Sequence, residues 1–154
     1  MPSVDLKRYS GLWYEIACLP NRFQNDCAGD VTATYTLLDD GEIKIINPCR
    51  KEDGEMKEAE GRARRASDNQ PNSKPKVRFA PAFLSFLPFV WGDYWIVDLA
   101  PDYSIAVIGE PNRHYLWVLA RTPKLDETIM EKISGRVRGM GYDLGRLIRT
   151  KQTH

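Results

Sequence analysis

Short segments in which apolar and polar residues alternate constrain this sequence more than any other feature. In the clearest of them, 31–37, Val, Ala, Tyr and Leu alternate with threonines. Alternation of period two predicts a β-strand with one buried face. Similar segments recur along the chain and end in clusters of Gly, Pro, Asn or Asp, spaced too closely for crossover helices. We expect eight antiparallel strands, at about 13–19, 31–37, 43–47, 55–66, 76–80, 94–99, 104–108 and 115–121.

A helix is predicted after the last strand. Thr122 is a suitable N-cap, Pro123 suits the first helical position, and apolar residues follow at helical spacing: Leu125, Ile129, Ile133 and Val137. Eight consecutive strands leave two exposed edges unless the sheet closes. The sequence therefore predicts an all-β fold, an eight-stranded antiparallel up-and-down β-barrel with a C-terminal α-helix packed on its outside. The single domain spans 1–154, with the barrel at about 9–121, the helix at about 123–140 and a short strand or tail at 142–154.

Composition argues against several functions. The 154 residues carry a net charge of +1, which gives no overall field to hold nucleic acid. The basic cluster at 62–65 is offset by acidic residues at 55–60. No apolar run reaches the ~18 residues that a membrane-spanning helix needs. Residues 1–5 lack the basic and apolar regions of an export signal, so the sequence as given predicts none.

Strand reversal gathers two sets of residues at opposite ends of the barrel. One end collects residues that we expect to close it structurally: Gly11, Trp13, Asp102, Tyr103 and Arg121. A guanidinium placed over an indole there would form a cation–π contact. The other end collects the loops 21–29, 48–54, 83–91 and 110–114. We expect this second end to be the mouth.

The closed-end residues resemble the three sequence motifs of the lipocalin family. The segment 11–17, GLWYEIA, is similar to the first motif, Gly-x-Trp. Residues 101–103, PDY, resemble the second motif, usually Thr-Asp-Tyr, with Pro101 in place of threonine. Residues 119–122, LART, resemble the third, whose arginine covers the motif-one tryptophan. The fuller matches resemble the bacterial outer-membrane lipocalin and apolipoprotein D branch, and the resemblance covers nearly the whole chain.

This resemblance implies a function and a location. The barrel would bind, store or transport a small hydrophobic ligand, such as a fatty acid or lysophospholipid, in membrane maintenance or stress. Branch members are often anchored to an envelope membrane, which implies the bacterial periplasm or outer membrane. Because no export signal is found in the given chain, a cytoplasmic location stays open. We expect a monomer or weak homodimer, with no catalytic residue, metal, cofactor or nucleic-acid partner.

Alternation along the strands identifies the side chains that would line the cavity. The expected ligand contacts are Ala33, Tyr35, Val77, Phe79, Tyr94, Ile96, Tyr115 and Trp117. The same parity, counted from an inward Trp13, turns Glu15, Ala17 and Leu19 inward and Cys18 outward. Three cations near the mouth could pair with an acidic head group or remain solvated: Arg50, Arg113 and His114.

The segment 80–91 is too apolar for an ordinary mouth loop. We expect its large side chains to contact a membrane surface or to fold over the entrance: Phe83, Phe86, Phe89 and Trp91. The alternative is that they fold back into the core.

Three further functions stay open: a lipid-modifying enzyme that uses a pocket cysteine, a haem- or pigment-binding barrel, and a purely structural or partner-binding barrel. An outward Cys18 argues against the first, and the only histidines are His114 and His154. Cys18 and Cys49 lie two strand spacings apart, about 9.5 Å, beyond the reach of a disulfide. If a bridge forms, Cys27 is therefore the better partner for either; free thiols are the alternative.

Overall fold

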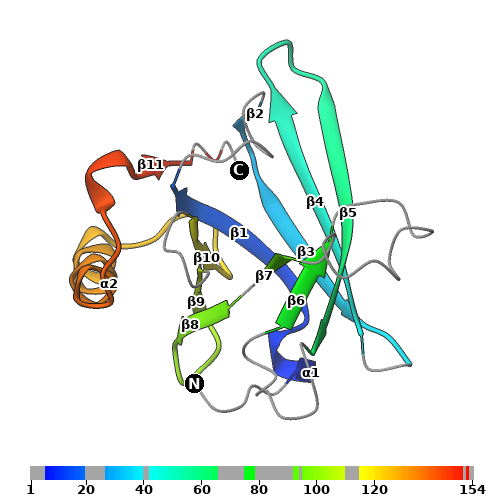
Figure 1. Ribbon diagram of the computed structural model, residues 1–154. Coiled ribbons are helices and arrows are strands. Elements are labelled where there is room, and N and C mark those ends of the chain that lie inside the picture. Colours follow the sequence, from blue (N-terminus) through cyan, green and yellow to red (C-terminus); the bar gives the residue numbers. More distant parts are fainter. Residues whose placement is uncertain are drawn as a thin grey trace.

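The structure, a computed structural model, describes residues 6–19, 27–39, 42–65, 75–78, 92–93, 95–109, 115–150 and 152, and the statements below concern these residues. Figure 1 shows the elements. The helices are α1 (Leu6–Tyr9), α2 (Glu127–Gly139) and the 3₁₀ helix η3 (Leu144–Arg146). The strands are β1 (Gly11–Cys18), β2 (Cys27–Gly29), β3 (Thr32–Leu37), β4 (Ile43–Lys51), β5 (Met56–Arg65), β6 (Pro75–Arg78), β7 (Gly92–Asp93), β8 (Trp95–Leu99), β9 (Ile105–Gly109), β10 (Leu116–Ala120) and β11 (Ile148–Arg149).

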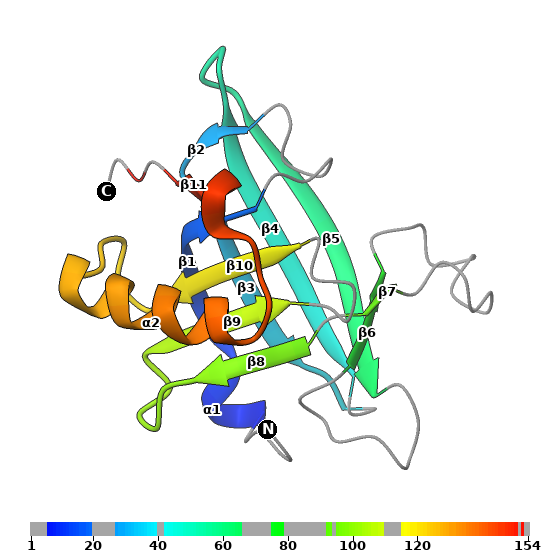
Figure 2. The same cartoon turned by 60° about the vertical axis from the view of Figure 1, so that its left-hand side comes forward.

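The strands form one antiparallel sheet that curves back on itself. Their order is β7-β6-β5-β4-β3-β1-β10-β9-β8, with β2 paired to β4 and β11 paired to β1. β7 pairs with β6 and β8 pairs with β9, and a single residue separates β7 from β8 in the sequence. The two ends of the order therefore meet, which closes the barrel seen in Figures 1 and 2. The all-β barrel with a helix near the C-terminus, predicted from the sequence, is confirmed.

Most strands lie within two residues of their predicted bounds, but β4 is longer. It continues through Pro48 to Lys51, where the sequence predicts a loop. Pro48 has no N–H to donate, and it falls between the ladder to β3, which ends at Ile46, and the ladder to β2, which begins at Arg50. On that side of β4 the proline therefore falls at a break between two ladders, while on the other side it lies opposite Glu58 of β5.

The interior of the barrel contains one apolar cluster. It takes alternate residues of the strands, so that Ala33 and Tyr35 of β3 are buried while the threonines between them are more exposed. This inward pattern was predicted from the alternation of 31–37. The buried members are Tyr9, Trp13, Ala33, Tyr35, Ile43, Ile45, Ile96, Ala106, Ile108 and Leu119.

A second apolar cluster lies between α2 and the outer face of the barrel. The strands β1, β9 and β10 contribute to it, and Figure 2 shows α2 lying along this side of the sheet. Met130, Ile133 and Val137 are the buried residues of the helix. Of the predicted stripe, Ile133 and Val137 are buried and Leu125 packs against this cluster from before the helix, whereas Ile129 is 40% exposed.

The helix α2 begins later than predicted. Its N-cap is Asp126, whose Oδ1 accepts a hydrogen bond of 2.8 Å from the backbone N–H of Thr128. Thr122, the predicted cap, instead donates its hydroxyl to the carbonyl of Lys124 at 2.8 Å. Asp and Thr are both suitable N-caps, and the sequence alone did not reveal which one the helix would use.

A bulge interrupts β1 between Glu15 and Ala17. Before the bulge, Glu15 lies opposite Leu119, a member of the interior cluster. After it, Ala17 lies opposite Val118, and both pack in the outer cluster beneath α2. Directly opposed residues of a sheet share a face. Glu15 therefore faces the interior, as predicted, whereas the inward prediction for Ala17 is wrong.

The bulge also reverses the expectation for the end of β1. Leu19 packs in the outer cluster, so its predicted inward orientation is wrong. Cys18 lies opposite Trp117, which packs against the interior cluster, so Cys18 is on the interior side rather than the predicted outer side. A bulge inserts one extra residue into a strand and shifts the alternation by one position.

The C-terminal segment completes the wall beside this part of β1. The ladder between β1 and β3 ends at Tyr14, and β11 pairs with β1 farther along, at Ala17 and Cys18. The backbone N–H of Thr150 then donates to the carbonyl of Ile16 at 2.9 Å. The short last strand predicted from the sequence is thus present as β11. It pairs with the part of β1 that lies beyond the end of the β1–β3 ladder (Figure 2).

Candidate functional site

Arg121 lies at the closed end of the barrel, directly after β10. Its guanidinium carbon is 3.8 Å from the centre of the Trp13 ring, the contact predicted from the sequence. Nη1 donates to the carbonyl of Leu12 at 2.9 Å, and Nε donates to the carbonyl of Tyr103 at 3.3 Å. Nη2 donates to three carbonyls in and after α1, those of Arg8, Tyr9 and Ser10. One side chain therefore ties the N-terminal helix, β1 and the β8–β9 turn together.

The other predicted closed-end residues gather around Arg121. Gly11 has a φ of 106°, a conformation that favours glycine. Asp102 accepts hydrogen bonds from the backbone and hydroxyl of Ser104, which hold the pKa of this carboxyl below its usual value. The ring of Tyr103 lies under the guanidinium of Arg8, 4.2 Å from its carbon. The structure thus brings all five predicted residues together.

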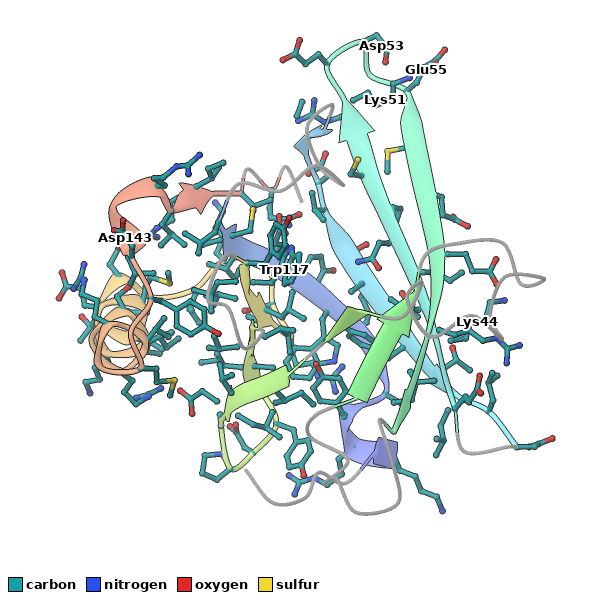
Figure 3. All side chains as sticks on the ribbon, in the orientation of Figure 1. Lys44, Lys51, Asp53, Glu55, Trp117 and Asp143 are labelled. Atoms are coloured by element: carbon teal, nitrogen blue, oxygen red, sulfur yellow. The ribbon has the colours of Figure 1, made fainter. Side chains whose placement is uncertain are left out.

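Several of the predicted ligand contacts lie on the interior face. Ala33, Tyr35 and Ile96 are buried in the interior cluster. Trp117 packs against that cluster, and its ring stacks on Tyr115 with 6.1 Å between ring centres. Both of these aromatic side chains are only partly buried. Figure 3 labels Trp117 beside β1. Trp13 is therefore fully buried, whereas Trp117 keeps part of its surface exposed.

A polar group of side chains lies on the interior side of β1. Glu15 is 3% exposed, and the hydroxyl of Thr150 donates to its Oε2 at 2.5 Å. Burial raises the pKa of the Cys18 thiol to about 12, and the negative charge of Glu15 and a hydrogen bond to Glu15 add to the rise. The sequence indicated an inward Glu15, but it gave no signal that Cys18 and Thr150 would join it.

Two amide side chains donate hydrogen bonds to the backbone at or just before the start of β3. The Nδ2 of Asn47 donates to the carbonyl of Thr32 at 3.3 Å. The Nε2 of Gln152 donates to the carbonyls of Glu15 and Val31, at 2.9 and 2.8 Å. The amide oxygens, Asn47 Oδ1 and Gln152 Oε1, are buried and have no hydrogen-bond partner within the described part of the chain. Sequence reasoning missed both residues, because only the fold brings β4 and the C-terminal segment beside residues 31–32.

The structure shows the bonding state of two cysteines and the partner of one cation that was considered for a ligand head group. Cys49 is disulfide-bonded and Cys18 is free. The backbone of Cys27 lies in β2, which pairs with the strand that carries Cys49. Arg50 forms an ion pair with the nearly buried Asp30, with 2.9 Å between Nε and Oδ2. Arg50 therefore anchors the β2 region, which supports a structural role for it.

Other predicted site residues fall outside the described part of the chain. These are Phe79, Tyr94, the mouth residues Phe83, Phe86, Phe89 and Trp91, and the cations Arg113 and His114. Val77 is placed by its backbone in β6, opposite Ala63. Within the described ranges, no cluster of His, Cys, Asp and Glu could hold a metal ion. No helix in the same ranges is long and apolar enough to span a bilayer.

The chain is similar to known proteins over almost its whole length. Residues 4–152 match the model of the lipocalin-like domain. Temperature-induced lipocalin-1 of Arabidopsis thaliana is 40% identical over 97% of this chain and 80% of its own length. The outer membrane lipoprotein Blc of Escherichia coli K12 is 35% identical over the same shares, 97% and 80%.

The branch expected from the sequence is also supported. Apolipoprotein D of Rattus norvegicus is 35% identical over 82% of this chain and 66% of its own length. Among solved structures, apocrustacyanin C1 superposes with a TM-score of 0.75 at 16% identity, covering 97% of this chain and 81% of that one. At that identity the structural match supports the fold alone.

Proposed function

The chain belongs to the lipocalin family, and from that premise we propose that it binds a fatty acid or lysophospholipid in its barrel, in membrane maintenance or stress. Lipocalins bind small hydrophobic ligands, and the relatives include outer membrane lipoproteins. The finer statement, that the ligand is an acyl chain, is our own.

The partly buried pair of Trp117 and Tyr115 carries this proposal. Around Trp13 the interior is filled, since that ring is 0% exposed. Toward the other end of β10, the stacked rings of Trp117 and Tyr115 are only partly buried, and Trp117 packs against the interior cluster. Apolar walls that protein does not cover are the surfaces that an acyl chain buries. The remaining predicted contacts, Val77, Phe79 and Tyr94, belong to the same proposed wall.

A series of fatty acids of increasing chain length tests the proposal. Each buried methylene contributes about 0.8 kcal/mol, so Kd should fall about fourfold per carbon until the cavity is full. Displacement of a fluorescent fatty acid measures this. Native mass spectrometry of freshly purified protein, with identification of any extracted lipid, names the natural ligand. A barrel that retains no lipid and ignores the whole series would contradict the proposal, and retained haem or pigment would support the alternative ligand class.

The variant Trp117→Ala tests the proposed wall directly. We expect it to weaken fatty-acid binding by about 1–2 kcal/mol, five- to thirtyfold in Kd, because an aromatic wall is lost. Leu12→Ala is the matched control, because Leu12 lies on the same barrel but is 44% exposed on its outside. Equal affinities of the two variants for fatty acid would show that Trp117 does not contact the ligand.

We also propose that the segment 80–91 contacts a membrane surface. Its sequence supports this, because large apolar residues recur in a segment predicted to lie at the mouth. Changing Phe86 and Phe89 to Ser together should abolish binding to liposomes while the barrel stays folded. Unchanged liposome binding would contradict the membrane contact and favour the alternative of a gate or core segment.

The disulfide at Cys49 supports a location in the cell envelope. Disulfides form and persist in oxidising compartments such as the periplasm. The outer membrane lipoproteins among the relatives support the same location. In protein isolated from its own cells, Cys49 should react with iodoacetamide only after reduction. Reaction of Cys49 in the denatured, unreduced protein would contradict an oxidising location.

We propose a carrier rather than an enzyme. From the sequence, an outward Cys18 argued against an enzyme, but Cys18 lies on the interior side. The structural reason is instead the protonation state of its thiol. Its thiol has a pKa of about 12 and is almost entirely protonated at neutral pH, whereas the nucleophile in cysteine catalysis is the thiolate. Lipid-modifying activity that disappears on alkylation of Cys18 would overturn this proposal.

A further inference from the structure

Ile148 lies in β11, the short strand that pairs with β1 beyond the β1–β3 ladder (Figure 2). It is directly opposite Cys18 of β1, and Cys18 is directly opposite Trp117 of β10. Directly opposed residues of a sheet share a face. Trp117, Cys18 and Ile148 therefore form one row across the interior side of the wall, carried by β10, β1 and β11.

The neighbours of Ile148 in the sequence support this orientation. Leu147 packs against the outer cluster, and Arg149 donates two hydrogen bonds, of 2.9 and 3.1 Å, to the carboxylate of Glu127 on α2. Thr150 donates its hydroxyl to the carboxylate that β1 places on the interior side. Successive side chains of a strand point to opposite faces, so Leu147 and Arg149 turn outward and Ile148 turns inward.

Of the three residues in this row, Ile148 is covered least by protein. It is 49% exposed, whereas Cys18 is buried and Trp117 is partly buried. A single exposed isoleucine on an outer surface, such as Ile129 on α2, is ordinary. An isoleucine that faces the interior is instead among the residues most often fully buried. In a barrel that binds an apolar ligand, that ligand can supply the missing cover.

We propose that Ile148 contacts the acyl chain beside Trp117, an inference that rests on the proposed function because it adds a residue to the same cavity. The strand β11 is then a wall of the cavity as well as a clasp on β1. A ligand that packs on Ile148 gains this contact only while β11 is paired with β1. Ligand binding and the pairing of β11 therefore stabilise each other.

The variant Ile148→Ala tests the contact. Truncating this side chain should raise the Kd for hexadecanoic acid about five- to tenfold, because apolar surface that the ligand buries is lost. Ile129→Ala is the matched control, because it removes the same atoms from a residue of similar exposure, 40%, on the helix outside the barrel. This control should stay within about twofold of the wild-type Kd. Equal Kd values for the two variants, both folded by circular dichroism, would overturn the contact.

Hydrogen exchange tests the coupling in the wild-type protein. The backbone N–H of Thr150 donates to the carbonyl of Ile16 at 2.9 Å, so its exchange reports the pairing of this segment with β1. Because coupling is reciprocal, saturating hexadecanoic acid should slow this exchange by the same factor, about five- to tenfold. The N–H of Gly141, which donates to the carbonyl of Arg138 at the end of α2, is the control and should change less than about twofold. No slowing at Thr150, or equal slowing at both amides, would overturn the coupling.

Binding by the wild-type protein separates the contact from the carrier function. If the wild type binds neither hexadecanoic acid nor any other member of the fatty-acid series, the carrier function and the contact are both wrong. If the wild type binds and Ile148→Ala binds equally well, the carrier function stands and Ile148 is not part of the site. A raised Kd in Ile148→Ala alone, together with slowed exchange at Thr150 in the wild type, supports both.

Discussion

The two halves of β1 differ in how they are built and in how far sequence predicts them. The first half, 11–14, pairs with β3 on one side, and Trp13 is enclosed by Tyr9, Tyr35 and Arg121. The second half, 15–18, contains a bulge and pairs with the C-terminal strand β11 in place of β3. Regular pairing produced a closed apolar end and turned Glu15 inward, and the bulge brought the thiol of Cys18 to the same interior side. The first half of β1 thus packs into a closed apolar end, whereas the second half places polar side chains on the interior side.

Alkylation of Cys18 is the prediction with the largest expected effect. Its pKa rises from 9.0 in the unfolded chain to about 12, so below pH 9 the folded thiol should react about a thousandfold more slowly from ionisation alone. Mass spectrometry of iodoacetamide-treated protein, with and without urea, measures this. Because the folded pKa is the higher one, the contribution of Cys18 to stability should be lost as the pH rises from about 9 to about 12, and stability should fall less steeply over this range in Cys18→Ala. Equal rates in urea and in buffer would place Cys18 outside the wall.

Trp13→Ala should cause the largest loss of stability. The ring is 0% exposed, donates to the carbonyl of Tyr9 at 2.8 Å and lies under Arg121. Removing a buried tryptophan costs about 3–5 kcal/mol. Urea denaturation measures the change. A loss of unfolding free energy below about 1 kcal/mol would contradict the interpretation that packing around Trp13 stabilises the closed end of the barrel.

Arg121→Lys should be less severe but still clear. A lysine keeps the charge, but it cannot present the planar fork that donates to carbonyls of Leu12, Tyr103 and the residues of α1. We expect a loss of about 1–3 kcal/mol in urea denaturation, together with faster hydrogen exchange of α1. Wild-type stability would show that charge alone, and not the fork, closes this end.

Thr150→Val should have the smallest effect. It removes the hydroxyl that donates to Glu15 and keeps the shape of the side chain, so we expect a loss of about 1–2 kcal/mol. The exposed residue Thr128 on α2 supplies the control, Thr128→Val. Equal stability of the two variants would mean that the C-terminal segment does not support the second half of β1.

Much of the first half could be predicted from sequence because its signals are local. Alternation in 31–37 correctly oriented Ala33 and Tyr35, and the spacing of Trp13 and Arg121 at strand ends gave their contact. In the second half of β1, alternation counted from Trp13 gave the wrong face for Ala17 and Cys18. Nothing in the local pattern GLWYEIAC marks the extra residue, since every position after Glu15 is apolar enough for either face.

The sequence by itself determined the strand order, the closed barrel, the outer helix and the aromatic interior, because each follows from side-chain periodicity, turn residues and short motifs. Only the tertiary structure decided that Cys18 faces inward, that Asp126 caps α2, and that Thr150 and Gln152 reach Glu15. The physical reason is sequence separation. These contacts depend on how two distant segments share one sheet edge, and periodicity within one segment carries no information about its partner.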